Sequence, residues 1–152
     1  MNLALVSIAM IFALTNLAKA EASLEYNDIG KRAYAAWDCA AYASLLEEKE
    51  EIGVQLFELG YDLHTKMIDA LREGLLNDEN TAQWPIAYRW YIVLGPSTDF
   101  SVGYMWAKFQ EHAYDETWEG DLSGTFDELK KLQKAKAESE FRSKNCALLL
   151  PR

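Results

Sequence analysis

The sequence has few of the residues that most catalytic and metal sites need. Among 152 residues there are two cysteines and two histidines, His64 and His112. There is no Gly-x-Ser-x-Gly elbow, no phosphate-binding loop and no Cys-x-x-Cys pair. A di-iron or di-manganese bundle places a glutamate three residues before each histidine, and Tyr61 and Phe109 occupy those positions. These absences leave no recognisable catalytic set.

Basic side chains are also scarce, because 15 lysines and arginines stand against 24 aspartates and glutamates. Nucleic acids and anionic membrane surfaces are bound by basic faces. We therefore expect the mature chain to bind neither nucleic acid nor membrane. An acidic surface of this kind is most often simply a soluble one.

The first 20 residues have the pattern of a secretory leader. Residues 3–17 form an apolar run with three polar interruptions, and small residues follow at Ala18 and Ala20. This pattern predicts signal-peptidase cleavage after Ala20 and a periplasmic or secreted mature protein. The segment before the run lacks lysine and arginine, and the alternative is an uncleaved membrane anchor. The run is shorter than the roughly 20 residues that span a bilayer, which favours cleavage.

Cleavage would leave one domain, residues 21–152. Only Lys19 is lost among the charged side chains, so 14 basic and 24 acidic residues remain, a net charge of −10. A chain of this length can bury a core of its own. We find no internal repeat and no second domain in it.

Two cysteines in an exported chain predict a disulfide between Cys39 and Cys146. The alternative is two unpaired buried thiols. In the chain-entropy account, a loop of about 100 residues is worth about 4.7 kcal/mol, against a typical total stability of about 5–15 kcal/mol. Such a bond would tie the first helix to the last.

Hydrophobic periodicity predicts an all-α fold, a single-domain bundle of four to five helices closed by that disulfide. The first helix should run from Asp28, its N-cap, to about Leu46. Its buried face is expected to hold six apolar residues at three- and four-residue steps: Ile29, Ala33, Ala36, Ala40, Ala43 and Leu46. The charged run 47–51 is expected to be a solvated turn or an exposed helical junction.

Four further helices follow in the predicted order. One runs from Ile52 to about Leu75, and Gly60 inside it predicts a close crossing of another backbone. Residues 86–94 are predicted to form a short helix in the centre of the core, with a buried strand as the alternative. Ser97 or Thr98 should cap a helix that ends near residue 118. The last helix should begin with a Thr125–Glu128 capping box, bury Phe126, Leu129 and Leu132, and end near Lys144.

His112 is the centre of the strongest polar cluster, together with Asp115 and Glu116. His112 and Glu116 are four residues apart and share a helix face, as metal ligands can. One pair is insufficient without further ligands, which His64 or Asp62 would have to supply. The simpler interpretation is a histidine at the edge of the core and acids at a solvated helix end. We therefore predict no metal and no cofactor.

Aromatic residues are unusually abundant, with five tryptophans, eight tyrosines and six phenylalanines. Most are expected in the core. Trp84 and Trp118 lie beside predicted loops, which makes them the candidates for a partner-binding patch.

Two stretches carry a resemblance to known proteins. They are Gly95-Pro96-Ser97-Thr98-Asp99-Phe100 with Gly103, and Phe141-Arg142-Ser143-Lys144-Asn145-Cys146. They resemble features of small exported helical proteins of marine bacteria and phages, which carry a signal peptide and an aromatic-rich cysteine helix like Trp37-Asp38-Cys39. The resemblance covers most of the mature chain. It implies an exported helical protein and supplies no activity and no site residue.

The leading hypothesis is an exported non-catalytic protein that binds another envelope or extracellular protein. The alternative is a metal-binding or hydrolytic enzyme centred on His112, Asp115 and Glu116. A third class is a purely structural or stress-buffering protein. The sequence names neither the partner nor the substrate.

Overall fold

The protein is an all-α single domain closed by one disulfide, as the periodicity predicts. The computed structural model describes residues 25–118 and 124–150. The predicted signal peptide and its cleavage after Ala20 lie outside these residues. The described part contains an N-terminal helix over residues 25–43 and then η1 (Glu47–Lys49), α2 (Glu50–Arg72), α3 (Ile86–Tyr91), α4 (Thr98–Thr117), α5 (Phe126–Ser143) and η2 (Cys146–Leu148).

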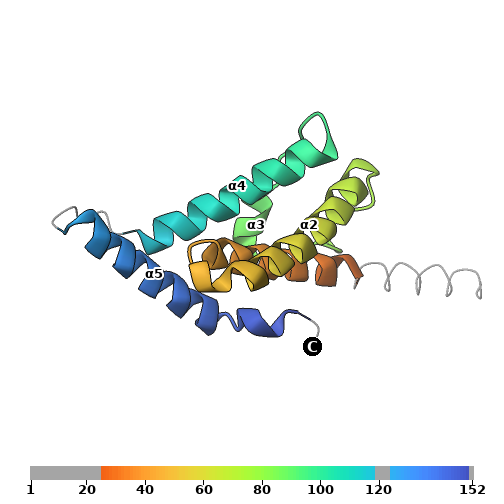
Figure 1. The fold of residues 1–152 in the computed structure, drawn as a ribbon. Helices are drawn as coiled ribbons and strands as arrows, with labels where there is room; N and C mark the ends of the chain where they lie inside the picture. Colours follow the sequence, from red (N-terminus) through yellow and green to blue (C-terminus); the bar gives the residue numbers. More distant parts are fainter. Residues whose placement is uncertain (1–24, 119–123, 151–152) are drawn as a thin grey trace, which may run out of the picture.

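The N-terminal helix forms the base on which the other helices pack. In Figure 1 it runs beneath α2 and α4, while α5 crosses the far end of α4. Five of its six predicted face positions are buried, and Ile29 is half-buried. Because the alanine side chains on that face are short, the helices that pack on it can approach closely. The helix already includes residue 25, so the prediction of Asp28 as its N-cap is wrong, and it ends at residue 43 rather than 46. The charged run forms η1 and the first turn of α2.

The predicted close crossing at Gly60 is confirmed. The fully buried ring of Trp37 lies against Gly60 of α2, where an added Cβ would overlap the ring. Trp37 Nε1 donates a hydrogen bond of 3.0 Å to the Phe57 carbonyl oxygen one turn earlier. The small residue in α2 therefore makes room for the largest side chain in the core.

Local signals set the helix ends. α2 ends in a Schellman motif, in which Leu75 N donates to Ala70 O and Gly74 N to Leu71 O. Gly74 has φ of +71°, a conformation that glycine adopts without strain. Ser97 caps α4 by accepting from Phe100 N, and the Thr125–Glu128 capping box at the start of α5 is confirmed. These caps satisfy backbone groups that the helices leave unpaired.

The predicted core face of α5 is wrong. Phe126 is 66% exposed, Leu132 is also exposed and Leu129 is half-buried. The buried positions are instead Gln133, Ala137 and Phe141, at steps of four residues. The reason is the angle of the helix, because α5 crosses the bundle and packs only its middle and C-terminal turns against it (Figure 1).

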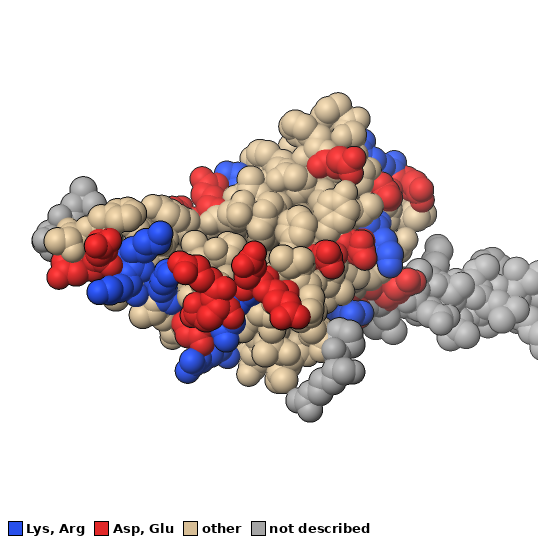
Figure 2. Space-filling model, in the orientation of Figure 1, with Lys and Arg blue, Asp and Glu red and all other residues tan. Residues whose placement is uncertain are grey.

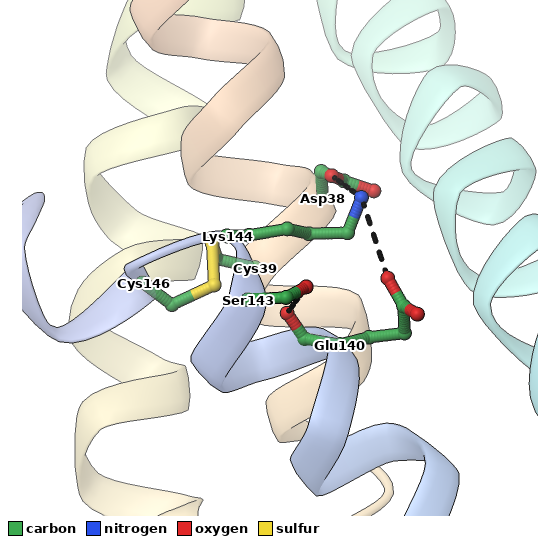
Figure 3. The surroundings of a disulfide bond; sticks show 6 residues. All are labelled: Asp38, Cys39, Glu140, Ser143, Lys144 and Cys146. Atoms are coloured by element: carbon green, nitrogen blue, oxygen red, sulfur yellow. Dashed lines mark hydrogen bonds and ion pairs between the residues drawn. A yellow bond between two sulfur atoms is a disulfide. The ribbon is translucent and has the colours of Figure 1, made fainter.

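The Cys39–Cys146 disulfide joins the N-terminal helix to η2, with 5.5 Å between the two Cα atoms. This bond confirms the predicted pairing, and both cysteines are buried. Beside it, Lys144 Nζ lies 2.9 Å from the buried carboxylate of Asp38 (Figure 3). A covalent bond and an ion pair thus hold the same two segments together.

Candidate functional site

The most exposed apolar side chains in the described helices lie on α3. Ile86 and Trp90 are each 80% exposed. They are four residues apart, so they share one face of this short helix. Tyr88, between them in sequence, is fully buried. The prediction of a helix over residues 86–94 in the centre of the core is therefore wrong for Ile86 and Trp90, and the helix ends at Tyr91 rather than 94. No strand forms among the described residues.

The inner side of α3 is anchored by several contacts, although its outer face is exposed to solvent. The Tyr88 hydroxyl donates to Met67 Sδ of α2 at 3.1 Å. The ring of Tyr91 packs edge-on against Phe109 of α4, with 5.1 Å between centroids. Arg89 donates to the Thr81 carbonyl oxygen at 3.1 Å. The helix is thus attached to α2, to α4 and to the preceding loop, and its outer face is presented in one orientation.

Trp84 does not belong to this surface. It is only 6% exposed and donates from Nε1 to the Tyr26 carbonyl oxygen at 3.0 Å. Its ring occupies the space above Gly30, where a Cβ would overlap it. Asn27 adds a second attachment, because its side-chain oxygen accepts from Gln83 N at 2.9 Å. Trp84 therefore fastens the loop before α3 to the N-terminal helix and exposes little of its ring to a partner.

Polar residues of α4 border the Trp90 ring. Trp90 and Tyr91 line one side of a shallow hollow of about 300 Å³, and α4 lines the other with Lys108, Glu111, His112 and Asp115. Lys108 and Glu111 form an ion pair of 2.6 Å. An exposed apolar centre with a polar border is the usual arrangement of a protein–protein interface.

The predicted catalytic cluster is only partly assembled. His112 is half-buried and shares the hollow with Asp115, but Glu116 does not line it. His64, suggested as a further ligand, lies in the core. Within residues 25–118 and 124–150, no three His, Cys, Asp or Glu side chains are gathered closely enough to hold a metal ion. The residues present in the hollow therefore do not make up a metal-ligand set.

His64 is a core residue that the sequence did not reveal as one. Its ring stacks on Trp37 with 3.7 Å between centroids. Nδ1 lies 2.6 Å from the Gly60 carbonyl oxygen, which can only accept, so Nδ1 carries the proton. Nε2 is buried and has no hydrogen-bond partner among the described residues. Burial lowers the pKa of His64 from 6.5 to about 3, and the hydrogen bond to Gly60 opposes this only in part.

Trp118, the other aromatic candidate, lies at the end of α4. Its ring is half-buried and stacks on Tyr114 at 5.5 Å between centroids. Phe126 at the start of α5 is 6.2 Å from it. These three rings form a second apolar cluster, which we call the α4–α5 corner. It is separate in sequence from Ile86 and Trp90.

Lysines lie beside both clusters, with Lys108 in the hollow next to Trp90 and Lys130 over the Phe126 ring. Figure 2 shows that the largest gathering of lysines and arginines on this face lies over α5, next to acidic side chains. Among the described residues, no helix is both long and apolar enough to cross a bilayer.

Comparisons with protein-family models, with curated proteins and with solved structures find no match. The resemblance to exported proteins of marine bacteria and phages therefore stays a prediction.

Two signals in the sequence could have identified the α3 surface. Ile86 and Trp90 are spaced to share a face, and Arg89 beside them disfavours a helix buried on all sides. A helix of only six residues also has room to bury one side while exposing the other.

Proposed function

We propose that this chain is an exported, non-catalytic protein that binds another protein through the outer face of α3. The observation that carries the proposal is the 80% exposure of both Ile86 and Trp90 on a helix whose other side is anchored. Tryptophan is among the residues most enriched at the energetic centres of protein interfaces. A rigid anchor loses little conformational entropy when a partner covers it.

The export part of the proposal is supported by the disulfide. Bonds of this kind form and persist in the periplasm and outside the cell, and they are rare in the cytosol. The partner is therefore expected among envelope or extracellular proteins. It should present an apolar pocket for the Trp90 ring and polar groups opposite Lys108, Glu111 and Asp115.

The test compares three forms of the disulfide-bonded protein as baits in extract from the envelope. They are the wild type, an Ile86→Ser/Trp90→Ser double variant and a Tyr114→Ser/Phe126→Ser double variant from the α4–α5 corner. We expect one protein to be retained by the wild type and by the corner variant, and to be lost with the α3 variant. Both changes replace exposed side chains, so all three forms should stay folded by circular dichroism.

The corner variant makes the outcome specific. Retention lost only with the corner variant would move the site to Tyr114, Trp118 and Phe126 and overturn the assignment to α3. Retention that is the same for all three baits, or absent from all three, would contradict binding through either cluster.

The alternative, a metal-binding or hydrolytic enzyme, is tested separately. If His112 and Asp115 act chemically, purified protein should contain bound metal or show an activity that His112→Ala abolishes with folding intact. A metal-free protein, together with a His112→Ala variant that behaves like the wild type, would remove that alternative.

A further inference from the structure

A second concave surface is formed without any residue of α3. It is a groove of about 580 Å³ above the C-terminal half of the N-terminal helix. The start of α2, the middle of α4 and the middle of α5 form its other sides. Pockets of 300–1,000 Å³ are the size that small molecules of drug-like dimensions occupy. The volume of the groove therefore suits a small molecule.

Small and aromatic residues form the apolar part of this groove. Ala40 and Ala43 form the floor with short side chains, and Gly53 lies close to Ala43, where a Cβ would come within 3.1 Å of the Ala43 Cβ. Phe57 and Trp106 form a wall, in which the two rings meet edge-to-face with 4.9 Å between centroids. Such a combination of open space and aromatic surface suits an apolar ligand with a ring.

One buried polar group faces this apolar surface. Gln133 of α5 lines the groove although only 6% of it is exposed. Its amide nitrogen makes a single long hydrogen bond, 3.5 Å to Thr117 Oγ1. Among the described residues, no donor bonds to its amide oxygen, and this oxygen is not fully enclosed. An amide oxygen that is open to the groove can accept a hydrogen bond from a polar group on a bound molecule.

The charges around the groove balance. Glu47 and Lys134 form an ion pair of 2.7 Å, and Glu50 and Lys130 are the two other charged residues of its lining. Glu48 of η1 and Glu51 of α2 lie on the adjoining surface, outside this lining. Because the lining itself holds two acidic and two basic residues, neither sign of charge is in excess there.

We infer that this groove binds an uncharged, largely apolar small molecule that contains a ring and one hydrogen-bonding group. The ring lies against Phe57 and Trp106, and the polar group pairs with the Gln133 amide. This site is independent of the proposed protein-binding face, because no residue of α3 lines the groove.

The experiment uses N-phenyl-1-naphthylamine, an uncharged fluorescent probe with one N–H group, on the full disulfide-bonded chain. We expect one probe per chain, with energy transfer from tryptophan because Trp106 lines the groove. Three competitors then share one naphthalene ring and differ only in charge: 2-naphthylmethanol, 2-naphthoate and 2-naphthylmethylammonium. The alcohol should displace the probe at concentrations at least about tenfold lower than either ion. High salt is included to screen the chain's net charge.

Two variants locate the site. Val54→Glu places a charge on the groove at a side chain that is 51% exposed, and it should weaken probe binding at least about tenfold. Val93→Glu makes the same change at an exposed position outside the groove and should leave binding unchanged. Gln133→Leu should weaken the binding of 2-naphthylmethanol more than it weakens the binding of naphthalene, which has no polar group.

Three outcomes would overturn the inference. They are no saturable binding of the probe, displacement by one of the ions at lower concentration than the alcohol, or equal loss of binding in Val54→Glu and Val93→Glu. The melting temperature of each variant shows whether a loss of binding reflects a loss of fold.

Discussion

Two regions of this bundle differ in what they do with their apolar and polar groups. In one, Cys39 and Cys146 are buried and bonded, and the buried Asp38 is paired with Lys144. In the other, α3 leaves Ile86 and Trp90 in solvent on a well-anchored backbone. The first arrangement stabilises the fold and exposes little to a partner. The second contributes little to stability, and this difference is the reason that we propose α3 as the binding face.

A large loss of stability is expected from removing the disulfide. Cys39→Ala/Cys146→Ala should lower the free energy of unfolding by about 2–5 kcal/mol, because the unfolded chain regains the freedom of a long loop. Urea unfolding measures this change. The folded variant should still bind the partner as the wild type does. An unchanged unfolding midpoint would show that the disulfide does not contribute to the free energy of unfolding.

A smaller loss is expected from Gly60→Ala. The new Cβ would overlap the buried Trp37 ring, and overpacking of this kind costs about 1–3 kcal/mol. Gly103→Ala in α4 is the matched control, since a Cβ there meets no atom within 4 Å. The control should gain up to about 1 kcal/mol from helix propensity. Equal effects of the two substitutions would contradict the close crossing.

Acid should destabilise the core through His64. The folded-state pKa is about 3 and the unfolded value is 6.5, so below pH 6.5 the unfolded chain takes up a proton that the folded chain does not. Stability is therefore complete above pH 6.5 and falls as pH decreases toward 3. Between pH 7.5 and 5 we expect a loss of about 2 kcal/mol. The free energy of unfolding of His64→Phe, measured by urea unfolding over the same pH range, should depend less on pH. An equally large loss of stability in the variant would contradict a role for His64.

The smallest effect on stability is expected on α3 itself. Ile86→Ser/Trp90→Ser should change the free energy of unfolding by less than about 0.5 kcal/mol, because both side chains are already in solvent. Tyr88→Ala on the same helix should cost about 3–5 kcal/mol, because that ring is fully buried. A double variant as unstable as Tyr88→Ala would show that the outer face is packed in solution.

The parts of the fold that depend on local signals could be predicted from the sequence. The alanine face of the N-terminal helix, the capping box at Thr125 and the crossing at Gly60 each follow from residues close together in the chain. The disulfide followed from compartment and cysteine count. Each of these needs no knowledge of how distant helices are oriented.

The predictions that were wrong depend on how whole helices and loops are oriented in the fold. Phe126 and Leu132 are as apolar as any core residue, but the crossing angle of α5 leaves them outside. Trp84 is adjacent to a loop in sequence, but the loop folds back so that its ring reaches Tyr26 and Gly30. The exposed face of α3 likewise depends on which side of the helix meets α2 and α4. Periodicity alone does not contain that information.

The central claim, that α3 presents a protein-binding face, is tested most directly by photo-crosslinking. The photoreactive residue p-benzoylphenylalanine would replace Trp90 in one form and the exposed Leu148 of η2 in another. Both forms would be exported and irradiated in cells. The account predicts an adduct with one envelope protein from position 90 and none from position 148. An equal adduct from both positions, or no adduct from position 90, would contradict it.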